Sequence, residues 1–125
     1  MFKHADLQIL VDHAGVHIME CGWQVVIRAD LVDPTPQQPH GLDYALILQN
    51  ERGYRIFGYD NAHAYDGAAV DDRWDHEHRT GRVGQRFQYE FSSAAELITH
   101  FFEALERYCA AQGVSSDFIV KDDND

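Results

Sequence analysis

The 125 residues and their composition are those of a single domain with a core of its own. Hydrophobic residues make up 45% of the chain and aromatic residues 12%, so folding needs no disulfide or metal to supplement the core. Asp and Glu number 21 against 10 Lys and Arg, and the resulting net charge of -11 argues against a broad basic surface for nucleic acid. No apolar stretch approaches the roughly 18 residues that span a bilayer, so we expect no membrane contact.

The start of the chain and its cysteines predict the compartment. Residues 1–6 lack the basic flank, the apolar segment and the small-residue cleavage site of a secretory signal. Cys21 and Cys109 are therefore expected to be reduced thiols rather than a disulfide. These features predict a cytoplasmic protein.

Alternating apolar residues predict strands in the first third of the chain. Leu7, Ile9 and Val11 alternate with other residues, and the same pattern runs from Trp23 to Leu31. Turns are expected at residues 13–15 and 20–22. All three prolines lie within residues 33–39, and proline supplies no donor to a strand ladder, so residues 33–40 are predicted to form a loop.

The middle of the chain predicts a hairpin followed by a polar segment. Residues 44–49 and 54–59 are strand-like, and the four residues that join them include Gly53. Residues 60–84 are rich in His, Asp, Arg and Gly. The alternation returns at residues 85–91, where Phe87, Tyr89 and Phe91 share one face, and predicts a further strand.

The C-terminal part predicts an amphipathic helix. Ser93 and Glu96 form a capping box, Gly113 supplies a stop, and Glu103 with Arg107 has i,i+4 spacing on the outer face. Apolar residues recur at helical spacing at Leu97, Ile98, Phe101, Phe102, Leu105 and Tyr108. Residues 118–125 are expected to form a frayed acidic tail. The prediction for residues 1–125 is one α+β domain, with an antiparallel sheet of about five to six strands and one C-terminal helix packed on it.

Two histidines of the polar segment are the strongest candidates for chemistry. If residues 74–78 are extended, His76 and His78 lie on one face, and Asp75 and Glu77 lie on the other. Two imidazoles can act as general acid and base, since each changes charge near neutral pH. They can equally bind a divalent metal with His63 or Asp60 as third ligand. The other interpretation is a solvated surface strand.

Neighbouring loops offer further candidates for this site. Asp60 and Asn61 follow the hairpin and are predicted to orient a histidine or a substrate, although Asx-turn hydrogen bonds to the following amides are the structural alternative. Tyr59 and His40 are outer members of the set. The sequence contains no P-loop, GxGxxG, GxSxG, HExxH or CxxC pattern, so we expect no cofactor.

The order of several short motifs resembles the TumE family of bacterial toxin-antitoxin proteins. These motifs are residues 39–44 (PHGLDY), 58–61 (GYDN), 75–78 (DHEH) followed by Gly81, and 89–91 (YEF) leading into the helix. The resemblance covers about residues 39–108. It departs at Glu77, where the family usually carries a basic residue. The resemblance implies a toxin component whose partner is a helix-turn-helix antitoxin protein.

Three functions follow from these candidates. The first is a small ribonuclease, in which His76 and His78 are the acid-base pair and Arg79 or Arg82 stabilises the charge of the phosphorane. The second is a non-catalytic acidic module recognised by a basic partner. The third is a divalent-metal-binding protein. RNA and a second copy of the chain are the other candidate partners. The predicted catalytic residues are His76, His78, Asp60 and Asn61, and the predicted substrate-binding residues are His40, Tyr59, Arg79 and Arg82.

Overall fold

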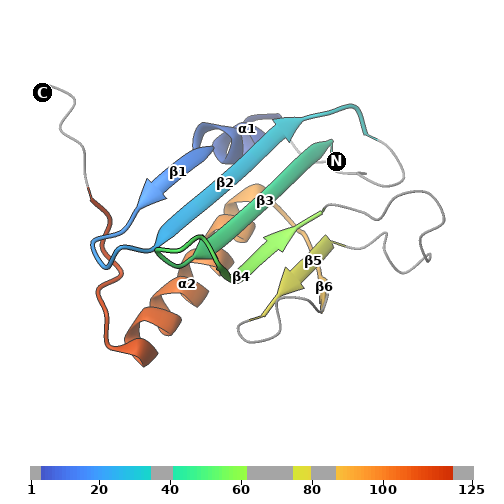
Figure 1. The fold of residues 1–125 in the computed structure, drawn as a ribbon. Coiled ribbons are helices and arrows are strands. Elements are labelled where there is room, and N and C mark those ends of the chain that lie inside the picture. Colours follow the sequence, from blue (N-terminus) through green and yellow to red (C-terminus); the bar gives the residue numbers. More distant parts are fainter. Residues whose placement is uncertain (1–3, 35–40, 62–74, 80–86, 120–125) are drawn as a thin grey trace, which may run out of the picture.

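The chain folds into an antiparallel sheet with two helices on one of its faces (Figure 1). This computed structural model describes residues 4–34, 41–61, 75–79 and 87–119. Within them the elements are α1 (His4–Asp12), β1 (Gly15–Ile18), β2 (Gln24–Leu31), β3 (Leu42–Gln49), β4 (Arg55–Asp60), β5 (Asp75–His78), β6 (Phe87–Tyr89) and α2 (Ala94–Gln112). The strands lie side by side in chain order. The predicted α+β class, the antiparallel sheet and the C-terminal helix are confirmed.

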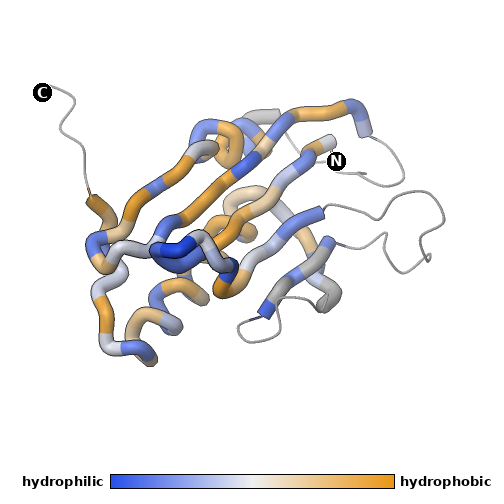
Figure 2. Tube along the Cα trace, in the orientation of Figure 1, coloured by the Kyte–Doolittle hydropathy of each residue, from blue (hydrophilic) through white to orange (hydrophobic). Residues whose placement is uncertain are grey.

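The sheet has a helix face and an open face, because successive strand residues point to opposite sides. Val25, Ile27, Leu46 and Leu48 are buried on the helix face, and Figure 2 shows apolar stretches along β2 and β3. The open face consists of the intervening positions. They are residues 24, 26, 28 and 30 of β2, residues 43, 45, 47 and 49 of β3, and residues 56, 58 and 60 of β4.

Helix α2 begins and ends where the sequence predicts. The Ser93 hydroxyl accepts a hydrogen bond from the Glu96 amide at 3.1 Å, and Gly113 ends the helix with a φ of 70°, a left-handed conformation that glycine adopts without strain. The Phe101 ring lies 5.4 Å from the ring of Phe57 and 6.3 Å from the ring of Tyr59. This aromatic contact fixes the end of β4 against the helix.

The strand predicted at Leu7, Ile9 and Val11 is wrong, because these residues belong to helix α1. Leu7 and Leu10 are buried while Ile9 is 42% exposed, which is the i,i+3 pattern of a helix packed on one side. Helix α1 contacts β2 and α2. The prediction of a single helix is therefore also wrong. The short apolar pattern of these residues is compatible with a strand and with a helix, and packing against the sheet selects the helix.

A carboxylate from α1 caps the N-terminus of α2. Asp6 accepts hydrogen bonds from the amides of Ala94 and Ala95, at 2.8 and 3.3 Å. The Ser93 hydroxyl accepts the hydrogen bond of the Glu96 amide, and Asp6 accepts those of two further amides in the first turn of α2. A negative charge at this position also interacts favourably with the helix dipole. The contact joins residues 88 positions apart in the chain.

The start of the predicted acidic tail is paired with the sheet. Phe118 forms an isolated antiparallel bridge with Met19, and the Ile119 amide donates to the Ile18 carbonyl at 2.8 Å. Residues 35–40, most of residues 60–84 and residues 120–125 lie outside the described part of the chain. Cys21 and Cys109 are free thiols. Among the described residues, no helix is long and apolar enough to cross a membrane.

We predict that Asp6→Ala lowers the free energy of unfolding by about 1–2 kcal/mol, since it removes a cap from α2. Chemical denaturation followed by circular dichroism measures the change. Asp12→Ala is the matched control, because Asp12 lies in the same helix and accepts only an exposed hydrogen bond from Gln8 among the described residues. Equal losses in the two variants would show that Asp6 does not act as a cap.

Candidate functional site

The register between β4 and β5 brings three of the predicted catalytic residues to the open face. Asp60 is paired with His76, and Gly58 is paired with His78. Residues paired directly across antiparallel strands share one face, with Cβ atoms about 4.5–5.5 Å apart. Asp60, His76 and His78 therefore occupy neighbouring positions, and the two histidine positions share a face as the alternation in residues 74–78 predicts.

A close approach of two strands explains the glycine in this site. A Cβ atom at Gly58 would lie 2.8 Å from the Leu46 carbonyl oxygen, closer than side chains are found to backbone. Strand β4 therefore lies tight against β3, and the position opposite His78 carries no side chain.

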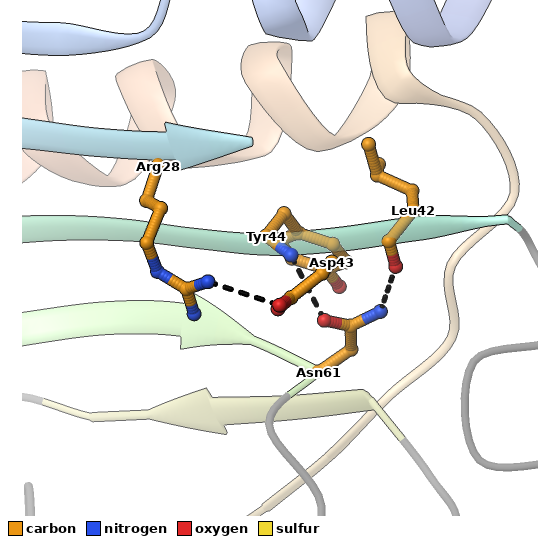
Figure 3. Close-up of polar contacts among 5 residues, drawn as sticks. All are labelled: Arg28, Leu42, Asp43, Tyr44 and Asn61. Carbon is orange, nitrogen blue, oxygen red and sulfur yellow. Dashed lines mark hydrogen bonds and ion pairs between the residues drawn. The ribbon is translucent and has the colours of Figure 1, made fainter. Parts of the chain in front are cut away.

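The rest of this part of the open face carries charges of both signs. The register aligns Arg28, Ala45, Asp60 and His76 in one row across β2 to β5. Arg28 Nη1 lies 3.1 Å from Asp43 Oδ2, and both side chains remain partly exposed (Figure 3). The nearest described arginine on this face is thus engaged with a carboxylate.

Asn61 lies on the helix face, where its side chain is fully buried. The Tyr44 amide donates to Asn61 Oδ1 at 3.0 Å, and Asn61 Nδ2 donates to the Leu42 carbonyl (Figure 3). The backbone N–H of Asn61 also donates to the Tyr44 carbonyl at 3.3 Å. These partners precede Asn61 in β3, whereas an Asx turn would use amides that follow it. The side chain extends the ladder between β3 and β4 beyond the last paired residue of β4.

The predicted pair of orienting residues is therefore divided between the two faces. Asp60 is on the open face with the histidine positions, while Asn61 and Tyr59 are on the helix face. Any role of Asn61 in chemistry would act through the position of β4. The predicted substrate-binding residues His40 and Arg82 lie outside the described residues.

We predict that Asn61→Ala lowers the free energy of unfolding by about 2–4 kcal/mol, because it leaves a buried amide and a buried carbonyl without partners. Denaturant titration measures the loss. The matched control is Asn50→Ala, since Asn50 also accepts two backbone hydrogen bonds, from Arg52 and Tyr54, but at an exposed turn. We expect a loss below about 1 kcal/mol there, because water replaces the lost partner. A loss at Asn61 no larger than at Asn50 would contradict the structural role.

A second group of polar residues surrounds a groove between the sheet and α2. Arg79 Nε donates to Glu77 Oε2 at 2.8 Å. The groove has a volume of about 460 Å³ and is lined by Phe57, Tyr59, Glu77, Arg79, Ala104, Arg107 and Tyr108. Tyr59 and Arg79 are predicted site residues. Sequence reasoning missed Arg107, whose helical spacing indicated only a pair with Glu103, and it treated Glu77 as a departure from the family.

The groove keeps the Tyr59 hydroxyl protonated at neutral pH. Burial and, to a lesser extent, the Glu77 carboxylate raise the pKa of Tyr59 to about 12, although Arg107 and Arg79 oppose the shift. The hydroxyl is thus within electrostatic range of both guanidinium groups. It is a hydrogen-bond donor across the physiological pH range.

A buried carboxylate lies further along β5 on the helix face. Asp75 is 4% exposed, and the Tyr44 hydroxyl donates to its Oδ2 at 2.7 Å. Burial and the neighbouring Asp75 raise the pKa of Tyr44 well above its usual value, so this donor stays protonated. The alternation in residues 74–78 indicates the face of Asp75 but not its burial, since carboxylates are rarely buried without partners.

The metal-site alternative obtains no support from the described residues, where no group of three or more His, Cys, Asp or Glu side chains is placed to hold an ion. His63, one proposed third ligand, lies outside them.

The fold and these two groups of polar residues define a small α+β protein with candidate sites on both sides of β4 and β5. The chain matches the family model described as toxin TumE over residues 6–109, and it belongs to this toxin family. The match begins at Asp6 and thus extends further toward the N-terminus than the motifs from residue 39 onward. Searches of curated proteins and of solved structures found no match.

Proposed function

We propose that the chain is the toxin of a bacterial toxin-antitoxin pair and that it cleaves RNA without a metal ion, through His76 and His78 on the open face. The family supports a toxin component and, with it, an antitoxin partner. The observation that carries the proposal is the pairing of Asp60 with His76, which puts a carboxylate next to the histidine positions.

The proposed reaction divides two proton transfers between the histidines. One imidazole removes the proton of the RNA 2'-hydroxyl, and the 2'-oxygen attacks the adjacent phosphorus. The other imidazole protonates the departing 5'-oxygen. The products are a 2',3'-cyclic phosphate and a 5'-hydroxyl. Asp60 accepts a hydrogen bond from an imidazole N–H, which orients the ring and stabilises its protonated form.

Positive charge near the ends of β5 would stabilise the phosphorane. Arg79 follows directly after His78 and is 55% exposed at its side chain. Arg82 follows three residues later. A guanidinium that approaches the equatorial oxygens would offset their charge in the transition state.

We predict that His76→Ala and His78→Ala each lower the rate of RNA cleavage by at least about 100-fold, the usual contribution of a general acid or base. Cleavage of a labelled RNA by purified protein is measured with and without EDTA. Both histidines remain in the control variant His13→Ala/His17→Ala, which removes two imidazoles elsewhere in the described structure.

The outcomes separate the mechanism from the family assignment. Cleavage that persists in the His76→Ala/His78→Ala double variant would exclude these residues as the acid-base pair. Cleavage abolished by EDTA would exclude the metal-independent reaction. Growth arrest on expression that the double variant retains would show a toxin with another mode of action.

A second candidate is an acidic interaction module, bound by a helix-turn-helix antitoxin or another basic partner. Asp30 and Asp43 are paired directly across β2 and β3 on the open face. Like charges at such a pair destabilise a sheet, and Arg28 is within ion-pair distance of Asp43. Together with the net charge of -11, this pair favours a partner that supplies positive charge.

We predict that Asp30→Asn stabilises the isolated protein by a few tenths of a kcal/mol up to about 1 kcal/mol, since it relieves the like-charge pair. The same variant is expected to slow association with the helix-turn-helix product of the neighbouring gene at low salt. Thermal melting and stopped-flow association measure the two effects. Glu103→Gln, which removes one negative charge from the outer face of α2, is the control. Unchanged melting and association in Asp30→Asn would contradict this candidate.

A further inference from the structure

The groove between the sheet and α2 contains a buried donor without a partner. Tyr59 is 6% exposed, and no described residue forms a hydrogen bond with its hydroxyl. Buried tyrosine hydroxyls normally have a partner, so this donor is available for a group in the groove. The Tyr44 hydroxyl on the same face does have one, the carboxylate of Asp75.

The groove also contains a guanidinium without a carboxylate partner. Arg107 forms no ion pair with any residue that the structure describes, although the chain carries 21 Asp and Glu. Arg79 lines the same groove, where its Nε bonds to Glu77. Among the described residues that line the groove, Arg79, Arg107 and Glu77 sum to a charge of plus one, within a strongly acidic protein.

The rest of the lining is suited to a small organic ligand. Phe57 and Tyr108 provide aromatic surface beside the charged residues, with ring centroids 6.5 Å apart. The volume of about 460 Å³ falls within the usual range of small-molecule sites, roughly 300–1,000 Å³. A guanidinium group can only donate hydrogen bonds, and the protonated hydroxyl of Tyr59 can donate one. The groove therefore favours a ligand that is rich in hydrogen-bond acceptors.

We propose that this groove binds the phosphate group of a nucleoside monophosphate, with Arg107 and the Tyr59 hydroxyl as donors and with the nucleobase against the aromatic wall. The arginine matches the geometry and charge of phosphate oxygens. Aromatic side chains are a common surface for nucleobases. Arg79 adds positive charge at the rim.

The groove lies on the opposite face of β5 from the proposed ribonuclease site, and Arg79, directly after β5, is the residue that the two proposals share. Tyr59 and Glu77 are paired with each other on the helix face, whereas Asp60, His76 and His78 occupy open-face positions. Binding in the groove therefore does not rest on RNA cleavage. A chain that binds the nucleotide without cleaving RNA supports the groove alone.

Isothermal titration with AMP, inorganic phosphate and adenosine tests the proposal on the full chain. We expect AMP to bind more tightly than inorganic phosphate, and adenosine to bind at least tenfold more weakly than AMP, because charged hydrogen bonds carry the affinity. Adenosine that binds as tightly as AMP would overturn the phosphate assignment. So would the absence of detectable AMP binding at concentrations up to about 10 mM.

Variants locate the binding. Arg107 is exposed, so Arg107→Gln should not affect folding. We expect this variant to bind AMP about tenfold more weakly. Tyr59→Phe keeps the ring and removes the donor, with an expected loss of about fivefold. Arg52→Gln, in the turn between β3 and β4, removes an arginine that is not among the residues lining the groove and should leave the affinity unchanged. Equal affinities for Arg107→Gln and the unmodified chain would overturn the proposal, and a thermal melt of Tyr59→Phe verifies its fold.

Discussion

The register between β3 and β4 is the constraint on which both candidate sites depend. Because the side-chain period of a strand is two, a shift by one residue would exchange the faces of Tyr59, Asp60 and Asn61. The buried side-chain carboxamide of Asn61 opposes such a shift, since its two hydrogen bonds fit only one alignment with Leu42 and Tyr44. Because β5 pairs with β4, the faces of β5 follow from the alignment of β4. The histidine positions therefore lie on the open face, and Glu77 lies at the groove.

Patterns that lie within one element predicted the structure well. The alternation in β2, the hairpin at Gly53 and the Ser93 cap of α2 each depend on neighbouring residues, and the structure has them where expected. The alternation in residues 74–78 also separates the positions of β5 correctly, with Asp75 and Glu77 on one face and the two histidine positions on the other. What failed was the start of the chain, where a short apolar pattern suited two conformations and tertiary contacts with β2 and α2 selected the helix.

The parts of the sites that depend on distant residues could not be predicted. Nothing near Arg107 in the sequence indicates a groove with Tyr59 and Glu77, because the contact needs the packing of α2 on β4 and β5. Likewise the burial of Asn61 reflects its partners in β3 rather than its own surroundings in the chain. Local reasoning grouped Tyr59, Asp60 and Asn61 by sequence proximity, whereas the pleat of a strand separates neighbours.

The cap that Asp6 places on α2 has a consequence for the order of synthesis. The carboxylate is made before the amides it satisfies, which belong to a helix 88 residues later. At the usual elongation rates of about 5–20 residues per second, roughly 4–18 s separate the two ends of this contact. During that interval α1 lacks its partner helix, so the native arrangement cannot form on the early part of the nascent chain. A toxin of this fold therefore becomes complete only after α2 has been made, however early α1 forms.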